Sequence, residues 1–213
     1  LNLLSRSPIW LTSLHALPDS VDAVLGALVE PGGNALRAAR AAEARPGGRV
    51  LVLGPGTIGL LTAMFVRAAG AEVHVLGLAL DVVRGLGFAN AWTADTLPDV
   101  PFDAVVDASN AATLPARALD LVEPSGRVVY IGLAGSPSTI DTRILALKDV
   151  TAVGILSASP GLAATIRAYA AGDVDPRPLV AATVGLDQGG AVLAGERPAD
   201  AGPGPKVHVD PRL

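Results

Sequence analysis

The chain has 213 residues, of which half are hydrophobic and only 3% aromatic; it has no cysteine, and its formal net charge is −4. A mildly acidic chain offers no electrostatic footprint for nucleic acid or for an anionic membrane surface. The absence of cysteine excludes a disulfide framework and a thiolate metal site, and it fits a cytoplasmic location. An aliphatic core of this kind is typical of helices packed on a parallel sheet.

The N-terminal part of the chain shows no clear period before a turn over residues 17–20. Apolar residues then recur at helical spacing over residues 21–29. Because proline disfavours a helical conformation in the residue before it, we expect this helix to break ahead of Pro31 and the two glycines that follow. A second helix is expected over residues 34–44, with Asn34 as its N-cap.

A strand, a glycine turn and a helix follow in the order that a dinucleotide site requires. Residues 49–53 (RVLVL) are the kind of apolar run that forms a strand buried on both faces of a parallel sheet. Residues 54–59 (GPGTIG) are a G-x-G-x-x-G turn, and apolar residues recur at helical spacing after it. The first glycine permits the bend, the second lets a pyrophosphate approach the backbone, and the third lets the helix lie close to the strand. The alternative is that the glycines serve only this packing.

Strands and helices alternate along the following hundred residues, which predicts an α/β fold of the doubly wound, Rossmann-like class. The expected six-stranded parallel sheet has the order 3-2-1-4-5-6, and its ligand crevice lies where the order reverses between the first and fourth strands. After the first strand, the expected strands are 71–76, 91–93, 102–107, 127–131 and 149–156, and the expected helices are 80–86, 111–122, 141–147 and 160–171. Beyond residue 172, prolines separate short apolar pieces at 179–184 and 206–209, which we interpret as strands outside the main sheet.

These motifs together resemble the medium-chain dehydrogenase/reductase superfamily, which includes the zinc alcohol, sorbitol and threonine dehydrogenases. The resemblance covers the chain from about Leu17 to its end. In chain order, it rests on Leu17-Pro18-Asp19, Leu28-Val29-Glu30-Pro31, the GPGTIG turn, Asp107-Ala108, Pro124-Ser125-Gly126-Arg127-Val128-Val129, Leu147-Lys148-Asp149, Asp175-Pro176-Arg177-Pro178-Leu179-Val180 and Gly204-Pro205-Lys206-Val207. It implies a division into residues 1–30 as a remnant of a catalytic domain, 31–172 as the dinucleotide-binding domain and 173–213 as a returning segment.

In that family, a GroES-like domain carries the ligands of the catalytic zinc, and the N-terminal portion that would hold them is largely missing from this chain. We therefore expect no zinc site here. The three histidines, His15, His74 and His208, are far apart in sequence, and we interpret His74 as a sheet histidine with its hydrogen bonds satisfied. Glu30, which lies near the zinc in some relatives, is interpreted as structural.

The resemblance also implies a cofactor site. Its expected residues are Gly54, Pro55, Gly56, Thr57, Ile58 and Gly59 for the pyrophosphate, Gly77 and Leu78 for the ribose, Ser109 and Asn110 for the adenosine-side edge, and Ile131, Gly132 and Leu133 for the nicotinamide. NAD enzymes of the family usually place an acid at the end of the second strand. Here Gly77 stands there, so the cofactor is NAD or NADP, and Arg84 is either a ligand of a ribose phosphate or a surface charge.

The resemblance implies an oxidoreductase that moves a hydride between the nicotinamide and a small alcohol or carbonyl substrate, with its catalytic acid or base unassigned. The alternative is a naturally truncated, non-redox relative that uses the same scaffold for another ligand, reaction or partner. The chain begins at Leu1 and not at Met, which leaves open whether it is a fragment or a processed protein.

The strand over residues 149–156 is expected to lie at the edge of the sheet. It is apolar except for Asp149 and contains no proline, so its free edge invites pairing with another chain. We expect a homodimer through this edge, which proline at Val153 would break, with no nucleic-acid or membrane partner. The alternative is that the C-terminal segment of the same chain covers the edge.

Overall fold

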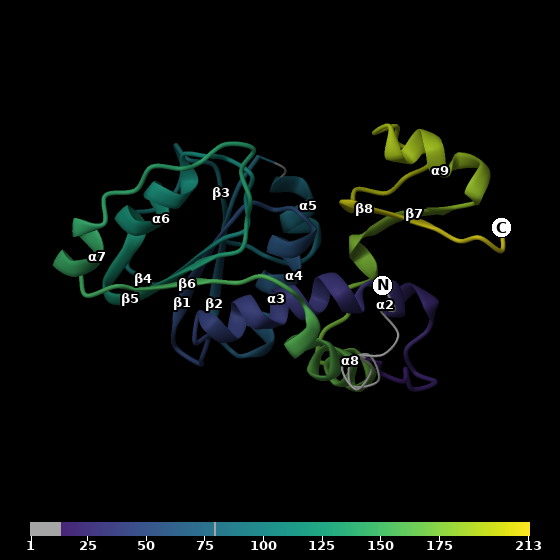
Figure 1. The fold of residues 1–213 in the computed structure, drawn as a ribbon, viewed down its shortest axis with the longest axis horizontal. Coiled ribbons are helices and arrows are strands. Elements are labelled where there is room, and N and C mark those ends of the chain that lie inside the picture. Colours follow the sequence, from purple (N-terminus) through teal and green to yellow (C-terminus); the bar gives the residue numbers. More distant parts are fainter. Residues whose placement is uncertain (1–13, 79) are drawn as a thin grey trace, which may run out of the picture.

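The computed structural model describes residues 14–78 and 80–213. Its centre is a six-stranded parallel sheet with the order β3-β2-β1-β4-β5-β6 (Figure 1). The strands are β1 (Arg49–Leu53), β2 (Glu72–Leu76), β3 (Ala91–Trp92), β4 (Phe102–Asp107), β5 (Val122–Tyr130) and β6 (Thr151–Gly154). The predicted fold class and strand order are therefore confirmed.

Helices cover both faces of this sheet. They are α2 (Ala23–Ala27), α3 (Val29–Ala41), α4 (Thr57–Ala68), α5 (Leu80–Gly85), α6 (Leu114–Leu121), α7 (Arg143–Leu147) and α8 (Leu162–Ala171), with a 3₁₀ turn, η2 (Ser159–Gly161), before α8. Because side chains alternate along a strand, Val50 and Val52 of β1 enter one core with α3, α4 and α8. Leu51 and Leu53 enter a second core with α6.

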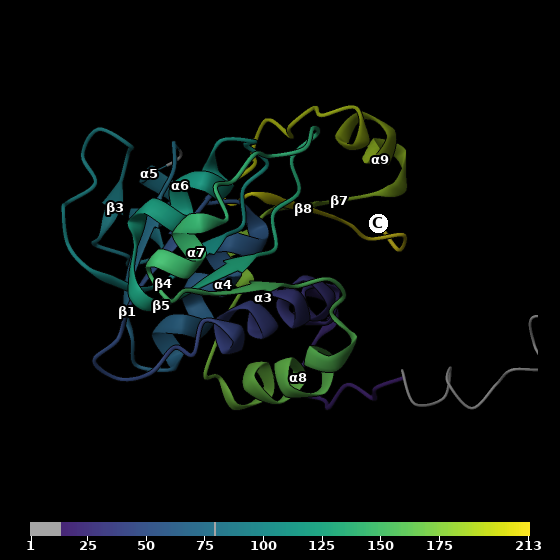
Figure 2. The ribbon, with the colours of Figure 1, turned by 60° about the vertical axis from the view of Figure 1, so that its left-hand side comes forward.

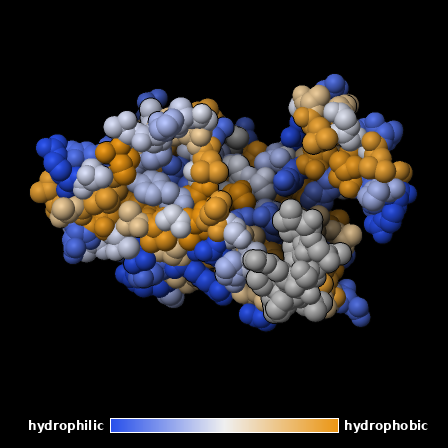
Figure 3. All heavy atoms as spheres, in the orientation of Figure 1, coloured by the Kyte–Doolittle hydropathy of each residue, from blue (hydrophilic) through white to orange (hydrophobic). Residues whose placement is uncertain are grey.

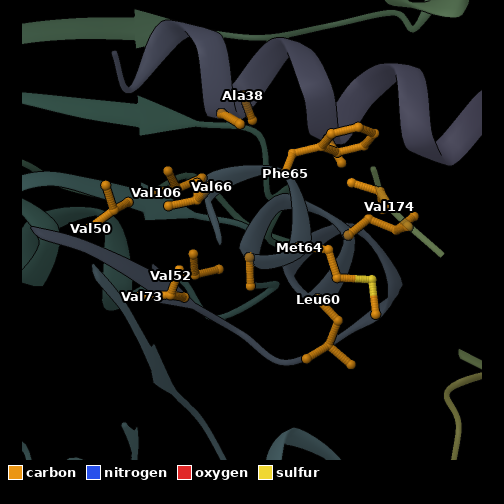
Figure 4. Close-up of a cluster of buried hydrophobic side chains, with 14 of the residues drawn as sticks. Ala38, Val50, Val52, Leu60, Met64, Phe65, Val66, Val73, Val106 and Val174 are labelled. Carbon is orange, nitrogen blue, oxygen red and sulfur yellow. The ribbon is translucent and has the colours of Figure 1, made fainter. Parts of the chain in front are cut away.

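The larger core lies between the sheet, α4 and α3 (Figure 4). Val52 and Val106 of neighbouring strands belong to this core together with Val66 of α4, and all three are fully buried. Each such side chain contributes about 1.5–3 kcal/mol by leaving water. Phe65 of α4 stacks on Tyr169 of α8 with 6.2 Å between ring centroids, which joins α8 to the core that supports the glycine turn.

The predicted helix break at Pro31 is wrong. Helix α3 begins at Val29 and runs through Pro31, which is its third residue and needs no amide hydrogen there because first-turn amides have no intrahelical acceptor. The glycines after Pro31 are buried: a Cβ atom at Gly32 would overlap the hydroxyl of Tyr169, and one at Gly33 would lie 2.8 Å from the carbonyl oxygen of Ala158. They let α8 and η2 lie against α3, as Figures 1 and 2 show.

Asn34 is consequently inside α3 and is not its N-cap. Its side-chain amide donates a hydrogen bond of 2.9 Å to the carboxylate of Glu30, one turn earlier. Asp22 is the residue that caps a helix in this region, because its carboxylate accepts from the backbone N–H of Leu25 at 2.9 Å. Leu28 ends α2 and directly precedes α3, so the two helices meet without the expected linker.

Other elements are present with different bounds. The segment with Pro124 and Gly126, expected to lie between the helix over 111–122 and the strand over 127–131, is part of β5, where the register with β4 shifts between Phe102 and Ala104. Strands β3 and β6 are shorter than expected. Helix α9 (Leu186–Leu193) was not expected, because Gly189 and Gly190 interrupt its sequence.

The C-terminal segment forms a small unit of its own. After a 3₁₀ turn, η3 (Arg177–Leu179), strands β7 (Val180–Val184) and β8 (Lys206–Val209) pair in parallel as a second sheet, with α9 between them in sequence. This agrees with the prediction of strands outside the main sheet. Apolar residues gather over the α9 region in Figure 3, where Leu186 and Leu193 are exposed. In the part of the chain that the structure describes, no helix has the length and apolar character needed to cross a membrane.

Candidate functional site

A cleft of about 810 Å³ opens at the carboxyl ends of β1, β2, β4 and β5. This is the edge where the strand order reverses between β1 and β4, which is where open α/β sheets bind ligands. The lining consists of Gly54, Pro55, Gly56, Ile58, Leu76, Gly77, Leu78, Ala94, Ala108, Ser109, Asn110, Ala111, Thr113, Leu114, Ile131, Gly132 and Leu133. None of these residues is charged, and most are apolar.

The glycine turn places backbone donors in the cleft. Gly54 has φ +96°, which favours glycine, and its N–H donates to the carbonyl oxygen of Leu76 at 2.9 Å. Gly56 is the N-cap of α4 and has no side chain to accept from the first-turn amides. No atom lies within 4 Å of a Cβ built on Gly56, so the approach to these amides is open. The N-terminus of α4 therefore offers an anion site made of backbone N–H groups and the positive end of the helix dipole.

The third glycine of the turn has a packing role. A Cβ atom at Gly59 would overlap the carbonyl oxygen of Gly54, so only glycine lets α4 lie this close to β1. Gly59 is buried, and neither it nor Thr57 lines the cleft. The other residues that we expected at the cofactor site all line it.

Across the cleft from the glycine turn, Asp107 at the end of β4 accepts hydrogen bonds from two loops. Its carboxylate accepts hydrogen bonds from the hydroxyl of Ser109 at 2.7 Å and from the backbone N–H of Ser109 at 3.0 Å. The carbonyl oxygen of Asp107 accepts from the N–H groups of Ile131 and Gly132, at 3.0 Å and 2.8 Å. One residue thus fixes both the loop after β4 and the loop after β5 at the cleft.

Burial raises the pKa values of two side chains in this wall, Asp107 and Tyr130. Asp107 is only 2% exposed, and this burial raises the pKa of its carboxyl, while the hydrogen bonds from Ser109 oppose the rise. Burial and the nearby Asp107 charge raise the pKa of Tyr130 to about 12. The Tyr130 hydroxyl therefore stays neutral near pH 7 and donates to the carbonyl oxygen of Pro115 at 3.1 Å.

Two leucines stand at the rim of the cleft. Leu78, after β2, is 95% exposed, and Leu133, after β5, is 80% exposed. Apolar side chains that are exposed around a concave site favour a ligand that covers them. The cleft accordingly combines a backbone anion site at α4 with exposed apolar side chains at its rim.

Sequence reasoning missed several residues of the lining. They are Leu76, Ala94, Ala108, Ala111, Thr113 and Leu114. Most of them end a parallel strand or follow its end within a few residues. Because ligands bind at the carboxyl ends of parallel strands, this position in the sequence could have identified them as lining residues.

The histidines and the charged candidates lie apart from this cleft. His74 is buried in β2; its Nε2 lies 2.7 Å from a carboxylate oxygen of Glu72, and its Nδ1 accepts from the indole N–H of Trp92 at 3.0 Å. This agrees with our interpretation of a satisfied sheet histidine. Arg84 lies 3.8 Å from Asp81 on the surface of α5. Within residues 14–78 and 80–213, no three His, Asp or Glu side chains are grouped as metal ligands would be.

Comparison with known proteins places this geometry in context. No protein-family model matches the chain. A relative in Rhizobium meliloti (strain 1021), provisionally named D-xylulose reductase, is 30% identical over 211 residues, with 89% of this chain and 58% of the relative covered. The chain spans about half the length of the curated relatives that it matches, at 58%, 52% and 53% for three of them.

Solved structures share the fold of this chain. A chain provisionally described as a zinc-binding dehydrogenase, from Sinorhizobium meliloti 1021 and bound to NADP, has a TM-score of 0.81 at 23% identity, with 92% of this chain and 61% of that chain covered. A chain described as a short chain alcohol dehydrogenase, from Escherichia coli CFT073 and complexed with NADH, has a TM-score of 0.78 at 18% identity, with 84% and 57% covered.

Proposed function

The chain belongs to the medium-chain dehydrogenase/reductase superfamily, and from this premise we propose that it is the cofactor-binding portion of an NAD(P)-dependent oxidoreductase acting on an alcohol or carbonyl substrate. The observation that carries the proposal is the N-terminus of α4. Its amides are uncapped, they face a cleft at the topological switch point, and Gly56 leaves the path to them open. A pyrophosphate fits these donors without any basic side chain.

The residues of the chain would act by positioning. The turn from Gly54 to Gly59 would hold the pyrophosphate, Gly77 and Leu78 would lie against the adenosine ribose, and Ser109 and Asn110 would border the adenosine side of the cleft. Ile131, Gly132 and Leu133 would pack against the nicotinamide, which, when bound, gives or takes the hydride. The backbone bonds from Ile131 and Gly132 to Asp107 support a fixed distance between these walls.

The lining residues that the structure describes offer hydroxyl and amide groups for binding but no group that titrates near pH 7. Ser109 already donates its hydroxyl to Asp107, so it is poorly placed to give that proton to a substrate. We accordingly assign the proton transfer that accompanies hydride transfer to no described residue of this cleft. The lining of this cleft likewise does not identify the alcohol or carbonyl substrate.

The experiment that tests this proposal is calorimetric titration of the chain with NADH and with NADPH. We expect saturable binding with one site per chain for at least one of them. Failure of both to bind at millimolar concentration overturns the proposal and favours a non-redox use of the scaffold.

We propose further that two copies of the chain pair through β6. This strand lies at the end of the sheet, and Thr151, Ala152 and Gly154 are exposed. The C-terminal strands pair with each other, and among the described residues none pairs with the outer edge of β6. The exposed run of backbone groups supports a self-complementary contact that joins two sheets into one.

A further inference from the structure

We propose that Pro55 requires glycine at position 77, so that no carboxylate stands at the adenosine ribose and the cleft discriminates little between the two cofactors. The wild-type cleft then takes NADH and NADPH with similar affinity. This inference rests on the proposed function and extends it to the choice between the two cofactors.

The contact joins the glycine turn to the end of β2. Gly77 directly follows β2, and its N–H donates to the carbonyl oxygen of Trp92 at 2.9 Å, which holds its backbone in place. A Cβ atom built on Gly77 would overlap the Cδ and Cγ atoms of Pro55. The pyrrolidine ring is closed on its own backbone and cannot rotate away as an open side chain would. As long as Pro55 is present, position 77 therefore accepts no side chain without displacement of the turn.

Position 77 is where a dinucleotide-binding fold distinguishes the adenosine ribose of NAD from that of NADP. In dinucleotide-binding folds, an acid about 20 residues after the glycine turn accepts hydrogen bonds from the ribose hydroxyls of NAD, and its charge repels the 2′-phosphate of NADP. Gly77 stands at that distance and lines the cleft beside Pro55. Because Gly77 has no side chain, the described lining of the cleft has no carboxylate that would reject a phosphate.

Among the residues that the structure describes, the lining also holds no cationic group that would require a phosphate. None of its lining residues is charged. Arg84, on the helix after β2, lies 3.8 Å from the carboxylate of Asp81, and its guanidinium is 3.5 Å from the carbonyl oxygen of Ala91. With neither a carboxylate nor a cation among the described lining residues at the ribose, no charge there separates the two cofactors, and both bind mainly through the pyrophosphate and the apolar walls.

The test compares NADH and NADPH by calorimetry at fixed ionic strength, in wild type and in Pro55→Ala, Gly77→Asp and the double variant. We expect wild type and Pro55→Ala to bind the two cofactors within about tenfold of each other. Gly77→Asp alone is expected to lower Tm and weaken both cofactors, because the new side chain displaces Pro55. The double variant is expected to regain Tm relative to Gly77→Asp and to prefer NADH by more than about tenfold, because the new carboxylate repels the 2′-phosphate.

The contact is tested separately by thermal unfolding of Gly77→Ala with and without Pro55→Ala. A smaller loss of Tm in the Pro55→Ala background supports the contact, and equal losses in the two backgrounds overturn it. A wild-type preference of more than about tenfold for either cofactor overturns the specificity inference and leaves the proposed function intact. Failure of wild type to bind either cofactor removes the proposed function itself.

Discussion

Gly59 lies so close to Gly54 that a Cβ atom on Gly59 would overlap the carbonyl oxygen of Gly54. Gly59→Ala must therefore push α4 away from β1 or distort the turn. We expect a loss of about 1–3 kcal/mol in the free energy of unfolding, the usual cost of overpacking, measured by urea denaturation. Gly135→Ala is the matched control, because no atom lies within 4 Å of a Cβ there. Equal stability of the two variants would contradict this account of the turn.

A similar relationship predicts the behaviour of α3. The hydroxyl of Tyr169 occupies the space of a Cβ at Gly32, and Thr165 Cγ2 lies 2.7 Å from it. Gly32→Ala is expected to destabilise the protein by about 1–3 kcal/mol. Adding Tyr169→Phe removes the hydroxyl, although it also removes its hydrogen bond to the carbonyl oxygen of Leu28. In urea denaturation, the double variant should lose less than the sum of the single losses; simple additivity would show that the ring and the glycine are not coupled.

Lys148 closes the C-terminal end of α6. Its ammonium donates to the carbonyl oxygens of Leu119, Asp120 and Val122, at 3.0, 2.8 and 2.8 Å. Lys148→Met keeps the apolar stem but leaves these carbonyls without a donor, so we expect a loss of about 1.5–3 kcal/mol in the free energy of unfolding. Lys206→Met is the control, because it makes the same exchange in β8 of the separate C-terminal sheet. A loss no larger than that of the control would contradict the capping role.

The dimer proposal is tested at a backbone donor of β6. The N–H of Ile155 donates to the carbonyl oxygen of Tyr130 in β5 at 2.9 Å. Because amides alternate along a strand, the N–H of Val153 also faces β5, and that of Ala152 faces the free edge. Ala152→Pro should convert a dimer into a folded monomer in light scattering, whereas Ala152→Ser, which keeps the N–H, should stay dimeric. A monomeric wild type, or a dimeric and folded Ala152→Pro variant, would show that β6 is not the interface.

The outward direction of the Ala152 N–H could not be predicted from the sequence. The sequence identified the edge strand, but it suggested proline at Val153, and the direction of each amide becomes known only from the pairing of β5 with β6. The strand, glycine turn and helix over residues 49–68 were predictable because their pattern is local. The start of α3 ahead of Pro31 also had a local signal, because proline fits the first turn of a helix. The burial of Gly32 against Tyr169 had none, because Tyr169 lies more than a hundred residues away in sequence.

In the candidate cleft, too, some residues could be predicted from the sequence and others could not. Residues next to strand ends could be placed there from the strand order alone, as Ser109 and Gly132 were. The buried Asp107 could not be assigned its positioning role, since its bonds to Ser109, Ile131 and Gly132 depend on how two loops meet. The overlap between Pro55 and Gly77 likewise joins a turn and a strand end that no periodicity connects.

The central claim is that the uncapped N-terminus of α4 binds the pyrophosphate of a nicotinamide cofactor, and Gly56→Ala tests it most directly. The added methyl group meets no atom of the protein within 4 Å, so the fold should survive with only the modest cost of alanine at an N-cap. The methyl group would stand in the path of the phosphates, and we expect calorimetry to show affinity for NADH and NADPH reduced by at least about tenfold. Unchanged affinity for both cofactors in a folded Gly56→Ala variant would contradict the claim.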